Sequence, residues 1–137
     1  MRDYESYSRE YRVEIEGKPA LVGSSATPFR GDPALHNPED MLVAALSACH
    51  CLSYLVLCAR AGIVVETYED AATGTMAFDR DAKVMRFTEV VLRPRVRVGA
   101  GSDHERARAL HKTAHHECFI ANSVNFPVRN EPAIREG

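Results

Sequence analysis

Apolar and polar residues alternate along residues 9–16, with the apolar side chains on one face and the charged ones on the other. This alternation predicts a half-buried strand that ends at the turn Gly17-Lys18-Pro19. Residues 20–22 fit a short partner strand. The stretch from 23 to 36 is rich in Gly, Pro and Ser, and it predicts a loop.

A long apolar stretch follows this loop. Asn37-Pro38-Glu39 has the residues of a helix start, and Gly62 suits its end. Residues 41–59 contain no Asp, Glu, Lys or Arg, so their length could cross a bilayer. An ionisable residue at the centre, His50, an acidic leading flank and the lack of an aromatic belt argue against a membrane span. We expect a helix buried on nearly all sides, in a protein core or a dimer.

The rest of the chain predicts strands and a second helix. Pro94 lies inside the longest predicted strand, at residues 84–98, and indicates an edge strand or a bulge. The order of elements predicts an α+β fold with largely antiparallel pairing, in a single domain over residues 1–137. The expected elements are strands at residues 63–67, 75–78 and 84–98, a helix capped by Ser102 or Asp103, and a short strand or tail at residues 126–134.

The composition is that of one ordinary soluble domain, with 137 residues, 45% hydrophobic and 26% charged. The net charge of −2 offers no broad positive field for nucleic acid or an anionic membrane. The first twelve residues are charged and polar, without the apolar core of a signal peptide. Because most of the cysteines fall in apolar, helix-like sequence, reduced thiols are expected. We therefore expect a cytoplasmic protein that binds neither nucleic acid nor membrane.

Two cysteines are candidates for chemistry, Cys49 on the apolar helix and Cys118 near the end of the second helix. A thiol reacts as the thiolate, whose formation a nearby cation favours. Arg30, in the loop before the apolar helix, is a candidate cation. Glu39 lies ten positions before Cys49, within a quadrant of the same helix face, and could hold an arginine over the sulfur. Spacing alone leaves purely structural thiols as the alternative, because buried cysteines commonly pack as small apolar residues.

The sequence NPEDMLVAALSAC at residues 37–49 resembles the signature of the OsmC/Ohr family of thiol-dependent organic hydroperoxide reductases. The segment AHHEC at residues 114–118 is similar to the second signature of that family. The loop PFRGDP at residues 28–33 is similar to one OsmC-like branch. The resemblance covers the chain from about Tyr7 to its C-terminus. It implies an OsmC-like α+β fold, with antiparallel sheets and two main helices, in an intertwined homodimer.

The resemblance also implies a reaction. Cys49 would be the peroxidatic residue, which attacks an organic hydroperoxide and becomes a sulfenic acid, and Cys118 would resolve it to a disulfide. An external dithiol, often lipoyl-linked in the family, reduces the disulfide again. Glu39 and Arg30 would complete the catalytic set, with no metal, flavin or other cofactor. An apolar pocket beside the apolar helix would favour alkyl hydroperoxides over hydrogen peroxide.

The chain departs from the family pattern at two places. The family usually has Pro directly after the second Cys and Ser three positions on, where this chain has Phe119 and Ala121. In the family, the arginine that activates the first cysteine often comes from an additional N-terminal strand and a Gly-rich turn. The candidates here are Arg2, Arg9 and Arg30, and we choose Arg30 because it lies next to the helix that carries Glu39.

Two other functions remain open at this stage. One is a non-catalytic OsmC-like dimer that binds a small hydrophobic ligand in an apolar interface cavity. The other is a zinc-binding domain, because His111, His115 and Cys118 stack at helical spacing. The remaining features have plainer interpretations. We expect core or interface roles for His50, packing roles for Cys51 and Cys58, and a solvated face for Arg93, Arg95 and Arg97.

Overall fold

The structure, a computed structural model, describes residues 3–137. The chain divides into two compact units, Met1–Leu42 and Val43–Gly137, and each is described by itself. The single domain over residues 1–137 stays a prediction.

The first unit contains a small hairpin. Strands β1 (Tyr11–Val13) and β2 (Leu21–Gly23) pair antiparallel, as the sequence predicts. Gly17, in the turn between them, has a φ of 75°, which glycine adopts without steric cost. The first strand is shorter than the predicted range 9–16, because pairing stops after β1 and Ile15 is left exposed. The loop that follows holds one short 3₁₀ turn, η1 (Thr27–Phe29).

Helix α1 (Pro38–Arg60) begins in the first unit and continues through the second, as predicted. Asn37 and Asp40 form a reciprocal cap. The Asp40 N–H donates to Asn37 Oδ1 at 2.8 Å, and the Asn37 N–H donates to Asp40 Oδ2 at 3.3 Å. The helix ends before Gly62, which has a φ of 72°. The start and stop residues in the sequence were therefore sufficient to place this helix.

Only one face of α1 is buried in the single chain. The buried residues repeat every fourth position, whereas Leu52 is 66% exposed and Val56 is 49% exposed on other faces. The expectation of a helix buried on nearly all sides is therefore wrong for the chain alone. By length and composition α1 could also cross a membrane, a property that core helices of soluble proteins share, and 22% of its most apolar stretch is buried. The buried residues are Leu46, His50, Tyr54 and Cys58.

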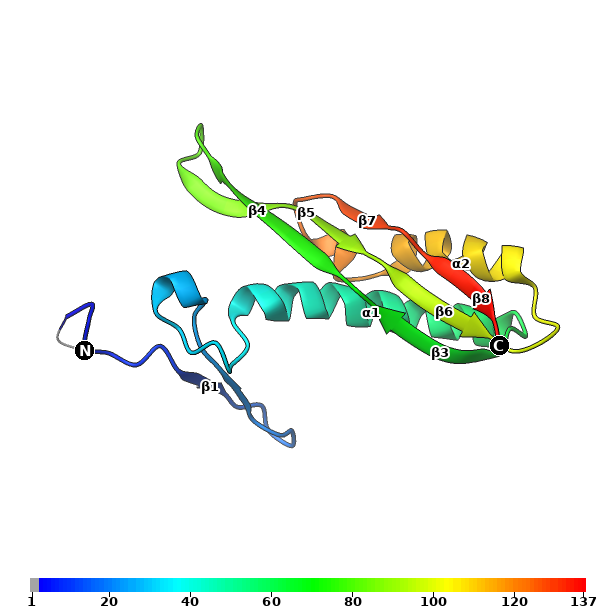
Figure 1. Cartoon of the computed structure of the whole chain (residues 1–137), viewed down its shortest axis with the longest axis horizontal. Helices are drawn as coiled ribbons and strands as arrows, with labels where there is room; N and C mark the ends of the chain where they lie inside the picture. Colours follow the sequence, from blue (N-terminus) through cyan, green and yellow to red (C-terminus); the bar gives the residue numbers. More distant parts are fainter. Residues whose placement is uncertain (1–2) are drawn as a thin grey trace. The chain divides into compact units, whose positions relative to one another are not determined.

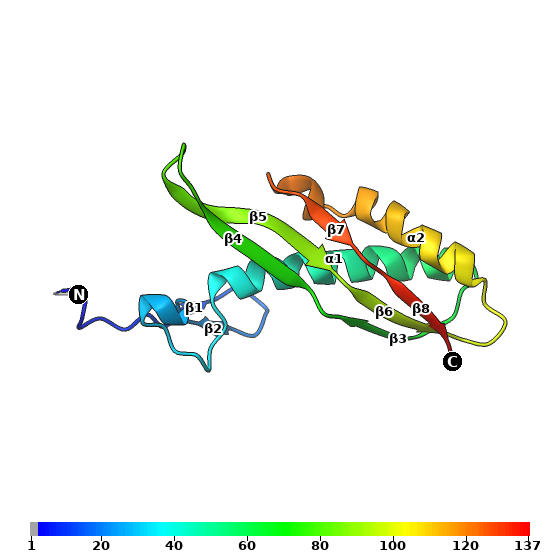
Figure 2. The same cartoon turned by 45° about the horizontal axis from the view of Figure 1, so that its top comes forward.

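The second unit contains three long strands, each interrupted at the same level, with both helices on one side of them (Figure 1, Figure 2). The two halves form sheets of order β3-β6-β8 and β4-β5-β7. The pairs β3–β6 and β4–β5 are antiparallel, whereas β5–β7 and β6–β8 are parallel. The parallel pairs arise because α2 follows β6 and precedes β7 along the chain. The helix returns the chain to the end at which β5 began, so β7 and β8 run in the same direction as β5 and β6. The elements are β3 (Val65–Asp70), β4 (Thr73–Asp79), β5 (Val84–Leu92), β6 (Pro94–Val98), α2 (His104–Glu117), η2 (Ala121–Ser123), β7 (Val128–Asn130) and β8 (Ala133–Glu136).

Arg93 lies at the interruption of the central strand and connects the edge strands across it. Its backbone N–H donates to Asp70 Oδ1 at 2.7 Å, and its guanidinium bonds Thr73 Oγ1 at 2.7 Å and Glu131 Oε2 at 3.1 Å. The sequence predicted one strand over residues 84–98 with Pro94 at an edge or bulge. The prediction of an edge strand is wrong, because β6 is the central strand of its sheet. The predicted strand is instead interrupted at Arg93, between β5 and β6.

The core consists of two clusters along α1. One joins α1 to α2 and β6 and contains Tyr54, Cys58, Val96 and Ala114. The other surrounds Leu46 and packs it against β5 and the segment after α2. Each helix is therefore fixed against the sheets by its own apolar face, and the ends of the two helices are held in register.

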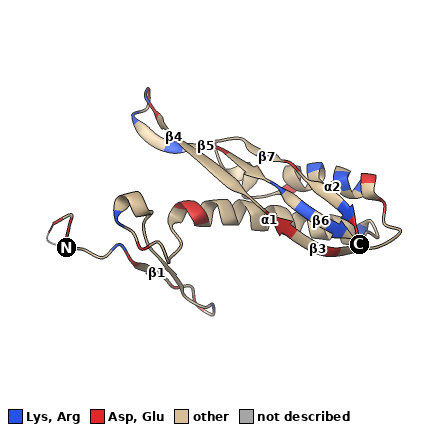
Figure 3. Cartoon of the chain, viewed as in Figure 1, with Lys and Arg blue, Asp and Glu red and all other residues tan. Residues whose placement is uncertain are grey.

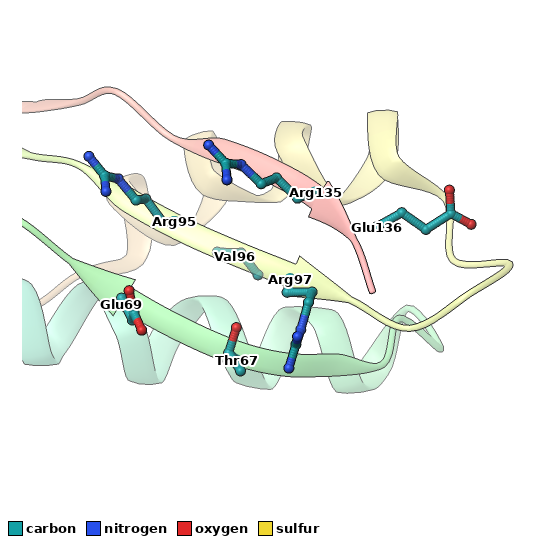
Figure 4. A pocket seen from close by; sticks show the side chains of 7 residues that line it. All are labelled: Thr67, Glu69, Arg95, Val96, Arg97, Arg135 and Glu136. Carbon is teal, nitrogen blue, oxygen red and sulfur yellow. The ribbon is translucent and has the colours of Figure 1, made fainter.

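The outer face of β3-β6-β8 is polar. Val96 is buried against the helices, and its neighbours Arg95 and Arg97 therefore lie on the opposite face. There they line a shallow pocket of 470 Å³ together with Arg135 (Figure 4). Arg97 pairs with Glu66 at 3.1 Å, and the acidic residues of β3 lie beside the basic residues of β6 (Figure 3). The predicted solvated face is thus confirmed for two of its three arginines, whereas Arg93 connects the strands.

Candidate redox-active site

Cys49 and Cys118 lie together in the second unit. Cys49 is half-buried on α1, and Cys118, with 1% of its surface exposed, is the residue at which α2 ends. Both thiols are free, and their side chains are within hydrogen-bonding reach of each other. The tertiary structure therefore brings together the two cysteines that the sequence selected.

The two thiols differ in acidity. Burial alone raises the pKa of Cys49, but hydrogen bonds from the Cys118 side chain and from the backbone N–H groups of Ile120 and Phe119 lower it below its ordinary value. Burial and the hydrogen bond to Cys49 raise the pKa of Cys118. Of the two thiols, Cys49 therefore loses its proton more readily and Cys118 less readily.

The turn after α2 presents these donors. Cys118 has extended φ and ψ, so the chain leaves the helix at that residue. Asn122 Nδ2 donates to the carbonyls of Cys118 at 3.0 Å and His116 at 2.8 Å, and the Ala121 N–H donates to Cys118 Sγ at 3.5 Å. Since proline has no N–H, Phe119 supplies a donor to Cys49 that the usual family residue could not.

Glu39 and Arg30 both lie in the first unit, whereas both cysteines lie in the second. Glu39 is in the first turn of α1, and its Oε2 is buried without a hydrogen-bond partner among residues 3–137. Arg30 follows η1 with a φ of 66° and forms an ion pair with Glu5. A role for either residue in activating Cys49 stays a prediction.

The other arginine candidates have different surroundings. The guanidinium of Arg9 stacks between the rings of Tyr7, 3.8 Å from its centroid, and Tyr4, 4.7 Å away. Arg2 lies outside the described residues.

An open apolar groove of 610 Å³ lies beside the end of α2. Leu52 and Val56 of α1 form one side, and Phe119, which is 82% exposed, forms the other. Phe119 directly follows Cys118 and bonds Cys49 through its backbone, so the groove adjoins the cysteine pair. Neither cysteine lines the groove itself, so it can hold an apolar group beside the turn that bears Cys118. Ser53, Arg60, His116, Glu117 and Asn122 complete the lining.

A buried histidine pair lies next to the cysteines, and sequence reasoning missed it. His50 Nε2 is 3.0 Å from His111 Nδ1, and the ring of Tyr54 stacks on His111 with centroids 3.8 Å apart. Burial and the neighbouring charge of His115 lower the pKa of His50 to about 4. Burial and the charge of His50 lower that of His111 to about 3. The core role expected for His50 is confirmed, but nothing in the spacing connected it with His111, because the two residues lie on different helices.

The zinc hypothesis is not supported. Among residues 3–137, no three His, Cys, Asp or Glu side chains come together as metal ligands. The packing hypothesis for the remaining cysteines fits the structure, because burial raises the pKa of both Cys51 and Cys58 and so disfavours their thiolates.

The chain is an α+β protein in which two helices lie on one side of interrupted strands. Each helix brings one free cysteine to the site, Cys49 from α1 and Cys118 from the end of α2. Residues 31–131 match the OsmC-like protein family, and the chain belongs to that family. The resemblance seen in the sequence is thereby confirmed. No curated protein matches the chain.

Solved structures share the fold. An OsmC-like protein of unknown function from Vibrio cholerae is 34% identical, with a TM-score of 0.85 over 93% of this chain and 86% of that one. An organic hydroperoxide resistance protein from Elizabethkingia anophelis is 19% identical, with a TM-score of 0.72 over 94% and 90%. The organic hydroperoxide resistance protein OsmC from Legionella pneumophila is 17% identical, with a TM-score of 0.64 over 94% and 97%.

Proposed function

We propose that this chain is a thiol-dependent peroxidase that reduces organic hydroperoxides to alcohols. The observation that carries the proposal is the asymmetric thiol pair, in which the pKa of Cys49 is lowered and that of Cys118 is raised. Membership of the OsmC-like family and the likeness to organic hydroperoxide resistance proteins support it.

The reaction has two steps on the protein. The Cys49 thiolate attacks the hydroperoxide oxygen that carries hydrogen, the O–O bond breaks, and the departing alkoxide takes a proton from solvent. Cys49 is then a sulfenic acid and the product an alcohol. The Cys118 sulfur attacks the sulfenic sulfur, a disulfide forms, and the hydroxyl leaves as water with the Cys118 proton. An external dithiol, for example a lipoyl-linked one, returns both cysteines to thiols.

The groove formed by Leu52, Val56 and Phe119 supports an organic substrate. An alkyl or aryl substituent gains free energy by leaving water for this apolar surface, whereas hydrogen peroxide has no such substituent. We expect Arg30, after exchanging Glu5 for Glu39, to stabilise the Cys49 thiolate and the developing charge on the peroxide.

The exposed apolar face of α1 supports a homodimer. Leu52 and Val56 are large, apolar and solvent-exposed in the single chain, and contiguous exposed apolar surface commonly marks an association site. Because the same two residues line the groove, we propose that the groove lies at the edge of the dimer interface. Burial of α1 between two copies would also account for its apolar composition without a membrane. Four free cysteines suit a reducing compartment, which supports a cytoplasmic location.

The first experiment is intact mass with disulfide mapping, before and after one equivalent of cumene hydroperoxide. Loss of two protons localised to Cys49 and Cys118 supports the two-cysteine cycle. Sulfenic or sulfinic acid at Cys49 with Cys118 unchanged keeps the peroxidatic role and assigns resolution to an outside thiol. No change at either cysteine would overturn the peroxidase proposal. The alternative would then be a non-catalytic OsmC-like dimer that binds a hydrophobic ligand.

A further inference from the structure

A third pocket lies between α2 and the strand β7, and neither cysteine lines it. Its volume is about 270 Å³, enough for a small organic molecule. Four of its lining residues, at positions 108, 111, 112 and 115, lie on one face of α2 because they follow helical spacing. Asn130 of β7 lies across from them.

Three buried polar atoms of this lining have no hydrogen-bond partner among residues 3–137. They are His111 Nε2, His115 Nδ1 and Asn130 Oδ1. His111 is 2% exposed, and its Nδ1 is engaged by His50. Because the two nitrogens of an imidazole point in nearly opposite directions, Nε2 faces away from His50, on a side chain that lines the pocket. Unpartnered polar atoms are costly to bury, and their grouping around one pocket indicates an absent polar ligand.

The charge of the pocket is positive. Arg108 donates to the Pro132 carbonyl at 3.2 Å, and Lys112 is exposed. Within the described part of the chain, neither forms an ion pair with a carboxylate, although Arg93, Arg97 and Arg129 each do. Two cations without counter-charges beside unpartnered ring nitrogens favour an anion.

The remaining walls are apolar. Val128 and Pro132 line the pocket between the polar groups. An inorganic anion would leave this apolar surface in contact with water, whereas an organic anion would cover it. The ligand chemistry that satisfies both parts of the lining is a carboxylate on a compact hydrocarbon.

We infer that the pocket between α2 and β7 binds a small organic carboxylate. The ring N–H of His111 and the cations of Arg108 and Lys112 hold the carboxylate, and Val128 and Pro132 contact its hydrocarbon part. This site is distinct from the hydroperoxide site, and it does not depend on the activity proposed for the cysteines.

The test is isothermal titration of the full-length reduced protein with benzoate at constant ionic strength. We expect one saturable site per chain, and Lys112→Gln to weaken binding by about tenfold. Arg106→Gln is the matched control, since Arg106 lies on the same helix but outside the pocket, and binding should be unchanged. His111 ring resonances in ¹⁵N NMR should shift on titration.

Absence of saturable benzoate binding would overturn the inference. Equal weakening by Arg106→Gln and Lys112→Gln would do the same, because it would indicate a general charge effect. Inorganic phosphate that binds as tightly as benzoate would overturn the organic part of the assignment. Circular dichroism of each variant distinguishes loss of binding from loss of folding. Benzoate binding is also measured on the unaltered protein, so the inference can be tested even if a variant does not fold.

Discussion

His50 Nε2 lies 3.0 Å from His111 Nδ1, and this contact joins the helix that carries Cys49 to the helix that ends at Cys118. Both imidazoles are buried and neutral, because burial lowers their pKa values to about 4 and about 3. The two helices are therefore connected by a neutral hydrogen bond at the residue that directly follows Cys49 in the chain.

This histidine pair predicts that stability decreases as pH falls below the ordinary histidine range. The folded state keeps both rings neutral down to about pH 4, whereas the unfolded chain binds protons near pH 6.5. Stability is thus fully present above pH 6.5 and falls by up to about 1.4 kcal/mol per pH unit for each ring. Urea unfolding between pH 7.5 and 5 measures the slope. His111→Phe should flatten it, and an unchanged slope in that variant would contradict the assignment.

The backbone donor at Phe119 predicts a difference between two substitutions. Phe119→Pro removes the N–H that bonds Cys49, whereas Phe119→Ala keeps it, and both remove the same aromatic ring. We expect the pKa of Cys49 to rise in the proline variant relative to the alanine variant. The pH dependence of Cys49 alkylation by iodoacetamide measures this. Equal profiles would show that the N–H does not stabilise the thiolate.

The apolar groove predicts a substrate preference. Burial of two methylene groups, at about 0.8 kcal/mol each, corresponds to a preference of about tenfold in kcat/KM. We expect cumene hydroperoxide to exceed hydrogen peroxide by at least this factor, and Leu52→Ser to reduce the ratio. Comparable values for the two oxidants in the unaltered protein would count against an organic substrate.

The proposed roles of Glu39 and Arg30 predict an electrostatic contribution to the attack of Cys49 on the hydroperoxide. Arg30→Gln and Glu39→Gln should each lower the rate of Cys49 oxidation by about 10²-fold, the effect of removing a donor at a reacting centre. Stopped-flow kinetics with cumene hydroperoxide measure this rate. Arg9→Gln distinguishes the arginine candidates, because a larger loss in that variant would transfer the role to Arg9.

The interruption of the strands predicts a stability effect at Asp70. Its carboxylate accepts from the Arg93 N–H at 2.7 Å and from Ser47 Oγ at 2.6 Å, so it joins the central strand to α1. Asp70→Ala should cost about 3–6 kcal/mol in unfolding free energy, the range for two hydrogen bonds to a charged group. Asp81→Ala, in the exposed turn after β4, is the control. Denaturant melts of the two variants give the comparison, and equal midpoints would refute the role of Asp70.

The sequence by itself determined α1, the choice of cysteines and the family. Asn37, Pro38 and Gly62 act within a turn of the helix ends, so local chemistry was sufficient to place them. The motif from Asn37 to Cys49 was long enough to indicate the OsmC-like family, which the match over residues 31–131 confirms.

The tertiary structure decided the features that depend on distant contacts. The interruption at Arg93 requires Asp70 and Glu131 from neighbouring strands, and no periodicity within residues 84–98 indicates it. The lowered pKa of Cys49 arises from groups at 118–120, and the contact of His50 with His111 joins residues 61 positions apart. Sequence patterns report local conformation, whereas hydrogen bonds between elements depend on how those elements pack, and that packing determines which of the two thiols is the more acidic.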